Sequence, residues 1–164
     1  RFKNKNKKEK GKTAPAIPKA VKSFLSDTSS FSPEWSGSIL RMLPESVRGA
    51  YPLLREHLRI LSAGICIGEA KGKDFIPAEE LALSTALRPD AFPVADLDWD
   101  DAIRYLKKEA LLLPAGTEKG YVLVRHKKFP LGFAKHLGNR ANNLYPQEWR
   151  IRTGYIPEQV KTFE

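Results

Sequence analysis

The chain has 164 residues, which is enough for one ordinary domain with a tail but short for two full domains. Its single cysteine, Cys66, excludes an internal disulfide and any multi-cysteine zinc site, and favours a reducing compartment. No apolar run approaches the roughly 18–20 residues of a membrane span, and the basic N-terminus lacks the apolar core of a secretory signal. We therefore expect a soluble, cytoplasmic protein.

The net charge of +9 is unevenly distributed along the chain. Residues 1–25 hold nine Lys or Arg and one Glu, whereas residues 26–118 hold ten Lys or Arg against fifteen acidic residues. Residues 119–152 contain eight Lys or Arg against Glu148 alone. The pattern indicates an acidic body with a basic C-terminal face, preceded by a basic arm. Such basic patches are typical of nucleic-acid binding.

Residues 1–30 have the composition of a basic, disordered linker, because they are rich in charge and proline and have little apolar surface to bury. Since the chain begins with Arg1, we expect it to be part of a longer protein. Two interpretations of the basic arm over residues 1–25 stay open. It is either a solvated tether or an additional contact to nucleic acid.

Ordered structure is expected from Phe31 onward, as short strands and helices. Apolar residues at helical spacing predict a helix over residues 51–58. Pro77, followed by acidic residues, predicts a second helix over residues 76–83. Short strands are predicted at residues 37–43 and 59–69.

The clearest helix is predicted over residues 97–109, with an aspartate at its N-cap, more acids in its first turn and two lysines near its end. Strands are then expected at residues 121–125 and 131–137, and a closing strand at residues 149–152. The predicted fold class is α+β: a small β-barrel of mixed short strands that carries two or three helices. This domain is expected to cover residues 31–160.

The sequence contains no motif for catalysis, for a cofactor or for a metal. A glycine-rich dinucleotide loop and a phosphate-loop lysine motif are both missing from it. Cys66 stands between two isoleucines, which is typical of a buried structural residue. The three histidines lack the paired spacing of metal ligands. We therefore expect no enzymatic activity in this chain itself.

Functional residues are expected within residues 119–152, where cations and hydrogen-bonding side chains alternate with apolar residues. Two adjacent strands are expected to bring residues 135–136 close to residues 125–127, so that one edge of the sheet is positive. Two roles stay open for Tyr145 and Trp149, stacking on a base or packing under the loop; burial is the favoured role for Trp149, because it lies in an alternating strand. The main predicted nucleic-acid contacts are Lys135, Arg140, Arg150 and Arg152, with Asn139, Asn143, Tyr145, Arg125 and His136 in secondary roles.

Residues 130–150 read Pro-Leu-Gly-Phe-Ala-Lys-His-Leu-Gly-Asn-Arg-Ala-Asn-Asn-Leu-Tyr-Pro-Gln-Glu-Trp-Arg. They resemble the C-terminal signature of bacterial Sun/Fmu-type RNA cytosine-C5 methyltransferases, of the NOL/NOP/Sun family. In that family a strand ending in Pro-Leu-Gly-x-x-Lys leads to a Gly-x-x-x-Asn-x-Tyr-Pro-like turn and a basic strand. Residues 59–69 are similar to the segment that opens the same module. The resemblance covers about residues 35–152.

The resemblance implies a PUA-like fold and RNA binding, in a domain that follows a catalytic domain using S-adenosylmethionine. The family's catalytic Pro-Cys and Thr-Cys motifs and its methyl-donor loop do not occur here, so no catalytic role is carried over to Cys66 and no cofactor is expected in this chain. The implied partners are a structured RNA, ribosomal rather than transfer RNA, and the protein's own N-terminal catalytic domain. The alternative is a docking domain that packs on its catalytic domain or on a ribosomal protein without binding RNA.

Overall fold

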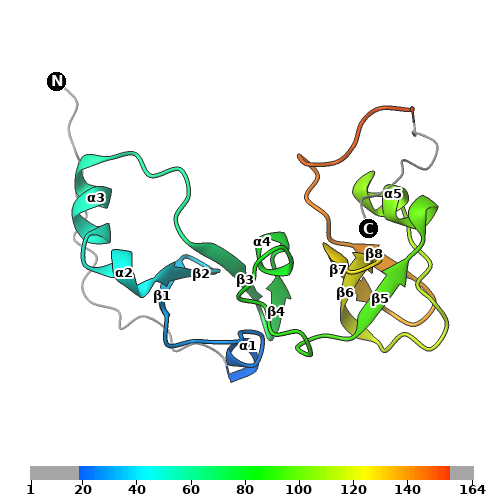
Figure 1. The fold of residues 1–164 in the computed structure, drawn as a ribbon, viewed down its shortest axis with the longest axis horizontal. Helices are drawn as coiled ribbons and strands as arrows, with labels where there is room; N and C mark the ends of the chain where they lie inside the picture. The colour runs from blue at the N-terminus through cyan, green and yellow to red at the C-terminus, as the bar shows by residue number, and fades with distance from the viewer. Residues whose placement is uncertain (1–18, 156–164) are drawn as a thin grey trace.

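The computed structural model describes residues 19–155, apart from the side chain of Ala20. The described strands form two four-stranded sheets, and the short helix α4 (Glu79–Ala82) lies between them (Figure 1). The chain completes the first sheet before it enters the second. The strands of the first sheet, in their spatial order, are β1 (Phe31–Ser36), β2 (Ile39–Pro44), β3 (Ile65–Lys71) and β4 (Asp74–Pro77).

The first sheet is an antiparallel meander that is interrupted by two short helices, α2 (Glu45–Arg48) and α3 (Tyr51–His57), between β2 and β3. The chain returns to the sheet at Gly64, which has a φ of 65°. A Cβ at this position would lie 2.2 Å from the carbonyl oxygen of Met42. Only glycine therefore allows β3 to begin so close to β2.

The second sheet has the order β5 (Val94–Leu97), β6 (Gly120–His126), β7 (Phe129–His136) and β8 (Ala141–Asn143). Strands β5 and β6 are parallel, and helix α5 (Trp99–Leu106) lies in the connection that a parallel pair requires. Strands β6, β7 and β8 are antiparallel. Asp98 caps α5 by accepting a hydrogen bond of 2.8 Å from the backbone N–H of Asp101.

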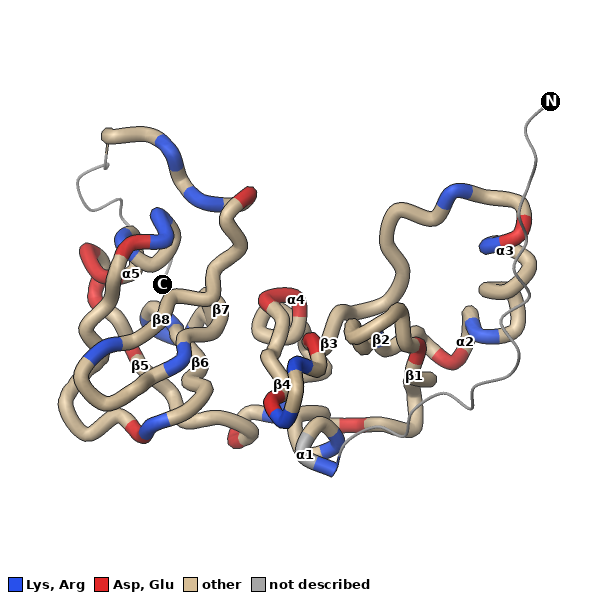
Figure 2. Tube along the Cα trace, turned by 180° about the vertical axis from the view of Figure 1, so that it is seen from behind, with Lys and Arg blue, Asp and Glu red and all other residues tan. Residues whose placement is uncertain are grey.

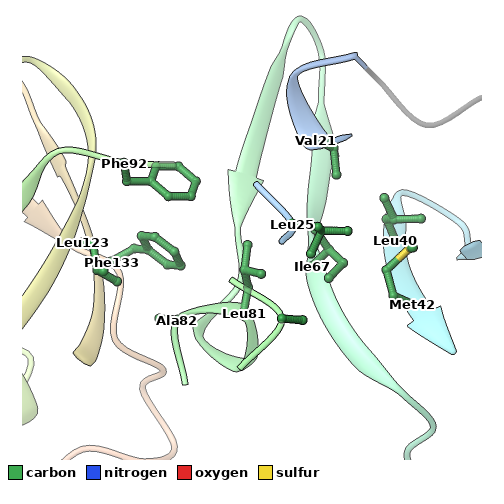
Figure 3. Close-up of a cluster of buried hydrophobic side chains, with 11 residues drawn as sticks. Val21, Leu25, Leu40, Met42, Ile67, Leu81, Ala82, Phe92, Leu123 and Phe133 are labelled. Atoms are coloured by element: carbon green, nitrogen blue, oxygen red, sulfur yellow. The ribbon is translucent and has the colours of Figure 1, made fainter. Parts of the chain in front are cut away.

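The second sheet is buried on both faces. Successive side chains of a strand point to opposite sides, and each side of this sheet packs against a hydrophobic core. Leu123 and Phe133 belong to a core that also contains residues of α4 and of the first sheet (Figure 3). Their neighbours Val124 and Ala134 belong to a second core, together with Tyr105 of α5. One hydrophobic core thus joins the two sheets, and the other attaches α5.

The predicted α+β class is confirmed, together with the mixture of parallel and antiparallel strands. The strands divide between two sheets, and neither closes into a barrel in the part of the chain that the structure describes. The described helices are α1 (Lys19–Lys22) and α2 to α5, of which only α3 and α5 exceed four residues.

The beginning of the described chain packs against the first core. Val21 and Leu25 are buried in it, and Leu25 pairs with Leu87 in an isolated bridge. The linker prediction for residues 1–30 therefore does not describe residues 19–25, whose apolar side chains at helical spacing have a core to join. Residues 1–18 lie outside the described residues.

Candidate nucleic-acid interface

The register of the β6–β7 hairpin separates the cations that were expected to form one positive edge. Lys135 pairs with Tyr121, whereas Arg125 pairs with Pro130 near the hairpin turn. In a hairpin of two antiparallel strands, a residue that pairs close to the turn lies at one end, and a residue that pairs far from the turn lies at the other end. Lys135 and Arg125 consequently lie at opposite ends of the hairpin, and the prediction of a single positive edge was wrong.

Arg125 is held by an acidic residue of the neighbouring strand. Its Nε lies 2.5 Å from Oδ1 of Asp96 and its Nη2 lies 2.7 Å from Oδ2, which is a bidentate ion pair. The hydrogen bonds from Arg125 hold the pKa of Asp96 below its usual value. A guanidinium that is occupied in this way is a poor phosphate contact.

Lys135 is also paired, although with a residue of the other sheet. Its Nζ lies 2.6 Å from Oδ2 of Asp74 in β4 and 4.9 Å from the centre of the Tyr121 ring. The hydrogen bond to Asp74 raises the pKa of Lys135 above its usual value. Lys135 therefore links the two sheets in the absence of RNA.

Two further predicted residues are used to attach the segment after β8. The amide of Asn143 donates to the carbonyl oxygens of Tyr105 and Glu109, at 2.8 and 3.1 Å, and its Oδ1 accepts from the backbone N–H of Tyr145. The Tyr145 ring packs edge-to-face on Tyr105 at 5.4 Å between centroids. Lys108 donates to the carbonyl oxygen of Tyr145. Asn143 and Tyr145 thus have structural roles here.

The β7–β8 turn presents polar groups to solvent. Asn139 and Arg140 are exposed, and Arg140 has no acidic partner among residues 19–155. The His136 ring lies below the turn, with Nδ1 3.1 Å from the carbonyl oxygen of Glu118 and Nε2 3.2 Å from that of Gly138. His136 therefore shapes this turn, while Asn139 and Arg140 are accessible to a ligand.

The segment from Leu144 to Tyr155 arches away from β8 and passes beside α5 (Figure 1); we call it the C-terminal strap. It is attached to the helix by a backbone hydrogen bond of 3.0 Å from Ile151 to the carbonyl oxygen of Leu106. Arg150 and Arg152 are exposed on either side of this bond, and neither has an ion pair with any residue that the structure describes.

The predicted closing strand at residues 149–152 is not a strand in the structure, and the expectation that Trp149 is buried was wrong. The Trp149 side chain is 47% exposed, with one contact to the Tyr145 ring at 6.3 Å between centroids. The turn Pro146–Trp149 breaks the alternation, because Trp149 donates its backbone N–H to the carbonyl oxygen of Pro146. The strap therefore carries an exposed aromatic residue directly before its two arginines.

An open cavity of about 370 Å³ lies between the strap and the end of α5. It is lined by three cations and one carboxylate, together with three uncharged residues of the strap: Lys107, Arg150, Arg152, Glu109, Ile151, Thr153 and Gly154. Figure 2 shows Lys and Arg along the chain after β8 and beside α5, whereas α4 between the sheets is acidic. Sequence reasoning missed Lys107, whose only signal was its place at the end of a predicted helix.

Other kinds of site find no support in the described part of the chain. Residues 19–155 contain no group of three or more His, Cys, Asp or Glu that is arranged to hold a metal ion. No helix in this range is long and apolar enough to span a membrane. Cys66 lies half-buried in β3, where burial raises the pKa of its thiol. A thiol whose ionisation is suppressed is a poor nucleophile.

Residues 92–151 match the family of methyltransferase RsmF PUA domains. The chain is 32% identical, over 110 residues, to ribosomal RNA small subunit methyltransferase F of Shewanella baltica (strain OS195). That match spans 64% of this chain and 22% of the relative. It is also 32% identical, over 92 residues, to the protein of the same name from Shewanella pealeana. That match spans 56% of this chain and 18% of the relative.

These matches confirm the predicted resemblance to the C-terminal region of Sun/Fmu-type methyltransferases. The chain spans about a fifth of the length of the curated relatives that it matches. The matched family segment begins just before β5 and ends in the strap, so it contains the second sheet, α5, Arg140 and Arg150, and it stops one residue before Arg152.

Proposed function

We propose that this chain is the RNA-binding accessory domain of a methyltransferase that acts on ribosomal RNA, with transfer RNA as the less favoured substrate. The methyl transfer, to C5 of a cytosine from S-adenosylmethionine, would take place in a separate N-terminal catalytic domain. The domain described here would hold the RNA so that the target base reaches that active site. Rate depends strongly on such placement, so a domain without catalytic groups can still affect turnover.

The observation that carries the proposal is a set of exposed arginines, on the second sheet and its strap, that have no acidic partner among residues 19–155. Arg140, Arg150 and Arg152 remain available for phosphates, whereas Arg125 and Lys135 are already paired with Asp96 and Asp74. Neutralising phosphates with arginine releases condensed counterions and supplies much of the affinity for RNA. These three arginines lie in or beside the segment that matches the PUA-domain family.

The structure also supports different roles for the predicted contact residues. Arg140 and Asn139, on the β7–β8 turn, are suited to a phosphate and a sugar or base edge. Arg150 and Arg152, on the strap, are suited to further phosphates of the same RNA. His136, Asn143 and Tyr145 hold the turn and the strap in place, so their replacement would weaken binding indirectly.

The test is the affinity of the chain for a fragment of small-subunit ribosomal RNA, measured by fluorescence anisotropy. We expect Arg140→Ala/Arg150→Ala to weaken binding by about 10-fold or more, because each charge-assisted contact contributes on the order of 1 kcal/mol. The matched control is Arg48→Ala/Arg55→Ala, which removes the same charge from exposed arginines near the first sheet that are paired with Glu45 and Glu34. Equal losses in both variants would contradict the proposed site.

A docking function is the second candidate, and it is favoured by a different observation. Exposed leucines surround α3 on the first-sheet side: Leu53 and Leu58 are each 60% exposed and Leu61 is 84% exposed. Leu58 and Leu61 line a cavity of about 290 Å³ between β1, α3 and the loop that follows it. Such apolar exposure is typical of a protein interface, and the catalytic domain is the partner we propose. Leu58→Ser/Leu61→Ser should then reduce RNA methylation by the full-length protein while leaving RNA affinity of this domain unchanged.

A further inference from the structure

We infer that the C-terminal strap and the end of α5 form a binding site for a single-stranded RNA segment, with one unpaired base stacked on Trp149. The phosphate next to that base would lie in the cavity that is lined by Lys107, Arg150 and Arg152. The inference rests on the proposed RNA-binding function and goes further, because it specifies unpaired RNA instead of a duplex.

The first step in the argument is the exposure of Trp149. A tryptophan that served only to pack the strap would bury its indole, yet this side chain is 47% exposed, and within residues 19–155 its one ring contact is with Tyr145. That contact is edge-to-face at 75°, which orients the ring without hiding it. Exposed aromatic rings beside cations are the surfaces on which unpaired bases stack.

The second step is the charge of the adjoining cavity. Lys107 lines one side and Arg150 and Arg152 line the other, while Glu109 contributes the one carboxylate among the lining residues. The walls therefore carry a net positive charge of about two, which suits a phosphate group. None of the three cations has an ion pair with another residue in the range 19–155.

The third step is the rigidity of the arrangement. The strap is fixed before Trp149 by Asn143 and Lys108, which bind the backbone of Tyr145, and after it by the hydrogen bond from Ile151 to Leu106. Trp149 directly precedes Arg150, which lines the cavity, so the aromatic residue and the cationic cavity adjoin on a segment that is attached at both ends before any RNA binds. Such pre-organisation reduces the entropic cost of ordering side chains upon binding.

A duplex does not fit the same site, because its bases are stacked and paired and offer no free face to an indole. The site therefore predicts a preference for loops, bulges or single-stranded ends. We expect the 164-residue chain to bind a single-stranded RNA 12-mer more tightly than a blunt duplex of the same length, in fluorescence anisotropy at low salt.

Replacing Trp149 separates stacking from packing. Trp149→Leu keeps an apolar side chain but removes the flat ring, and we expect it to weaken single-strand binding by about 5- to 100-fold. Trp149→Phe keeps a flat ring and should retain most of the affinity. The control is Phe129→Ala, since Phe129 is an even more exposed aromatic residue, at 69% against 47%, that also lies beside lysines but at the turn end of the β6–β7 hairpin. It should bind as the unmodified chain does.

The possible outcomes are distinct. Loss of single-strand affinity in Trp149→Leu, with Trp149→Phe and Phe129→Ala close to the unmodified chain, supports the site. Full single-strand affinity in Trp149→Leu, with a loss in Arg140→Ala/Arg150→Ala, overturns the stacking site but leaves the proposed RNA-binding function standing. Equal losses in Trp149→Leu and Trp149→Phe also overturn it, since a flat ring alone then does not suffice. If the unmodified chain binds no RNA, the proposed function fails and the stacking site fails with it.

Discussion

Replacing Glu79 with glutamine is expected to stabilise the protein at alkaline pH and to leave its stability nearly unchanged at acid pH. Glu79, at the start of α4 between the two sheets, is only 7% exposed, and its Oε1 has no hydrogen-bond partner among the described residues. Its Oε2 lies 3.4 Å from Oη of Tyr105, which donates at 3.1 Å to the carbonyl oxygen of Phe133. Burial raises the pKa of Glu79 from 4.5 to about 7.

The magnitude follows from this shift. A carboxyl group whose pKa is raised by folding contributes stability that is fully present below pH 4.5 and is lost as the pH rises through about 7. A pKa change from 4.5 to about 7 corresponds to about 3 kcal/mol of unfolding free energy. Glutamine is neutral at every pH, so the Glu79→Gln variant avoids this loss. We expect the variant to be more stable than the unmodified chain by about 3 kcal/mol near pH 8.5 and by less than about 0.5 kcal/mol near pH 4.5.

The assay is urea denaturation followed by tryptophan fluorescence at several pH values between these limits. The matched control is Glu56→Gln, which removes the same charge from an exposed position on α3. Its stability should follow that of the unmodified chain at every pH. If Glu79→Gln and the unmodified chain lose stability in parallel as the pH rises, the reasoning about a buried, protonated Glu79 is refuted.

Three further predictions concern the packing around Gly132, the N-cap of α5 and the ion pair between Arg125 and Asp96. Gly132→Ala would place a Cβ 1.9 Å from Oε1 of Glu79 and 2.2 Å from Oη of Tyr105, at a φ of 149°, so we expect a loss of about 3 kcal/mol in urea denaturation; a loss below about 1 kcal/mol would contradict this packing. Asp98→Ala removes the cap of α5 and should cost about 1 kcal/mol in the same assay, whereas an unchanged midpoint would show that the cap is dispensable. Arg125→Ala should change RNA affinity by less than about 2-fold in anisotropy, because Asp96 holds its guanidinium; a loss as large as that of Arg150→Ala would show that the pair opens for RNA.

The elements that were predicted correctly are those whose signals are local. Helix α5 was expected from its capping aspartate and first-turn acids, and Asp98 does cap it. Helix α3 was expected from apolar residues at helical spacing, and it covers Tyr51–His57. Both signals lie within one or two turns of the chain, so no knowledge of the tertiary structure is needed to read them.

The elements that were missed depend on partners far along the chain. The helix predicted over residues 76–83 is present as α4 (Glu79–Ala82), but Pro77 does not begin it. Pro77 ends strand β4 instead, because pairing with β3 places residues 74–77 in the sheet. Strand β8 has only three residues and exists because it pairs with the end of β7. A sequence pattern does not contain such pairings.

The candidate site was predictable in composition and less so in arrangement. The exposed arginines Arg140, Arg150 and Arg152 lie where the charge distribution indicated. The partners of Arg125 and Lys135 are 29 and 61 residues away in sequence, so their occupation by Asp96 and Asp74 was hidden. Trp149 was assigned to a buried strand from its alternating neighbours, but the preceding turn exposes it.

The central claim is that RNA phosphates bind the exposed arginines of the second sheet and its strap. Its most direct test is the dependence of RNA affinity on salt concentration, for the unmodified chain and for Arg140→Ala/Arg150→Ala. Each phosphate contact contributes about 0.7–0.9 to the slope of log affinity against log salt. We predict a steep slope for the unmodified chain that falls by about 1.5 in the double variant. An unchanged slope in the variant would contradict the claim and place the phosphate contacts elsewhere in the chain.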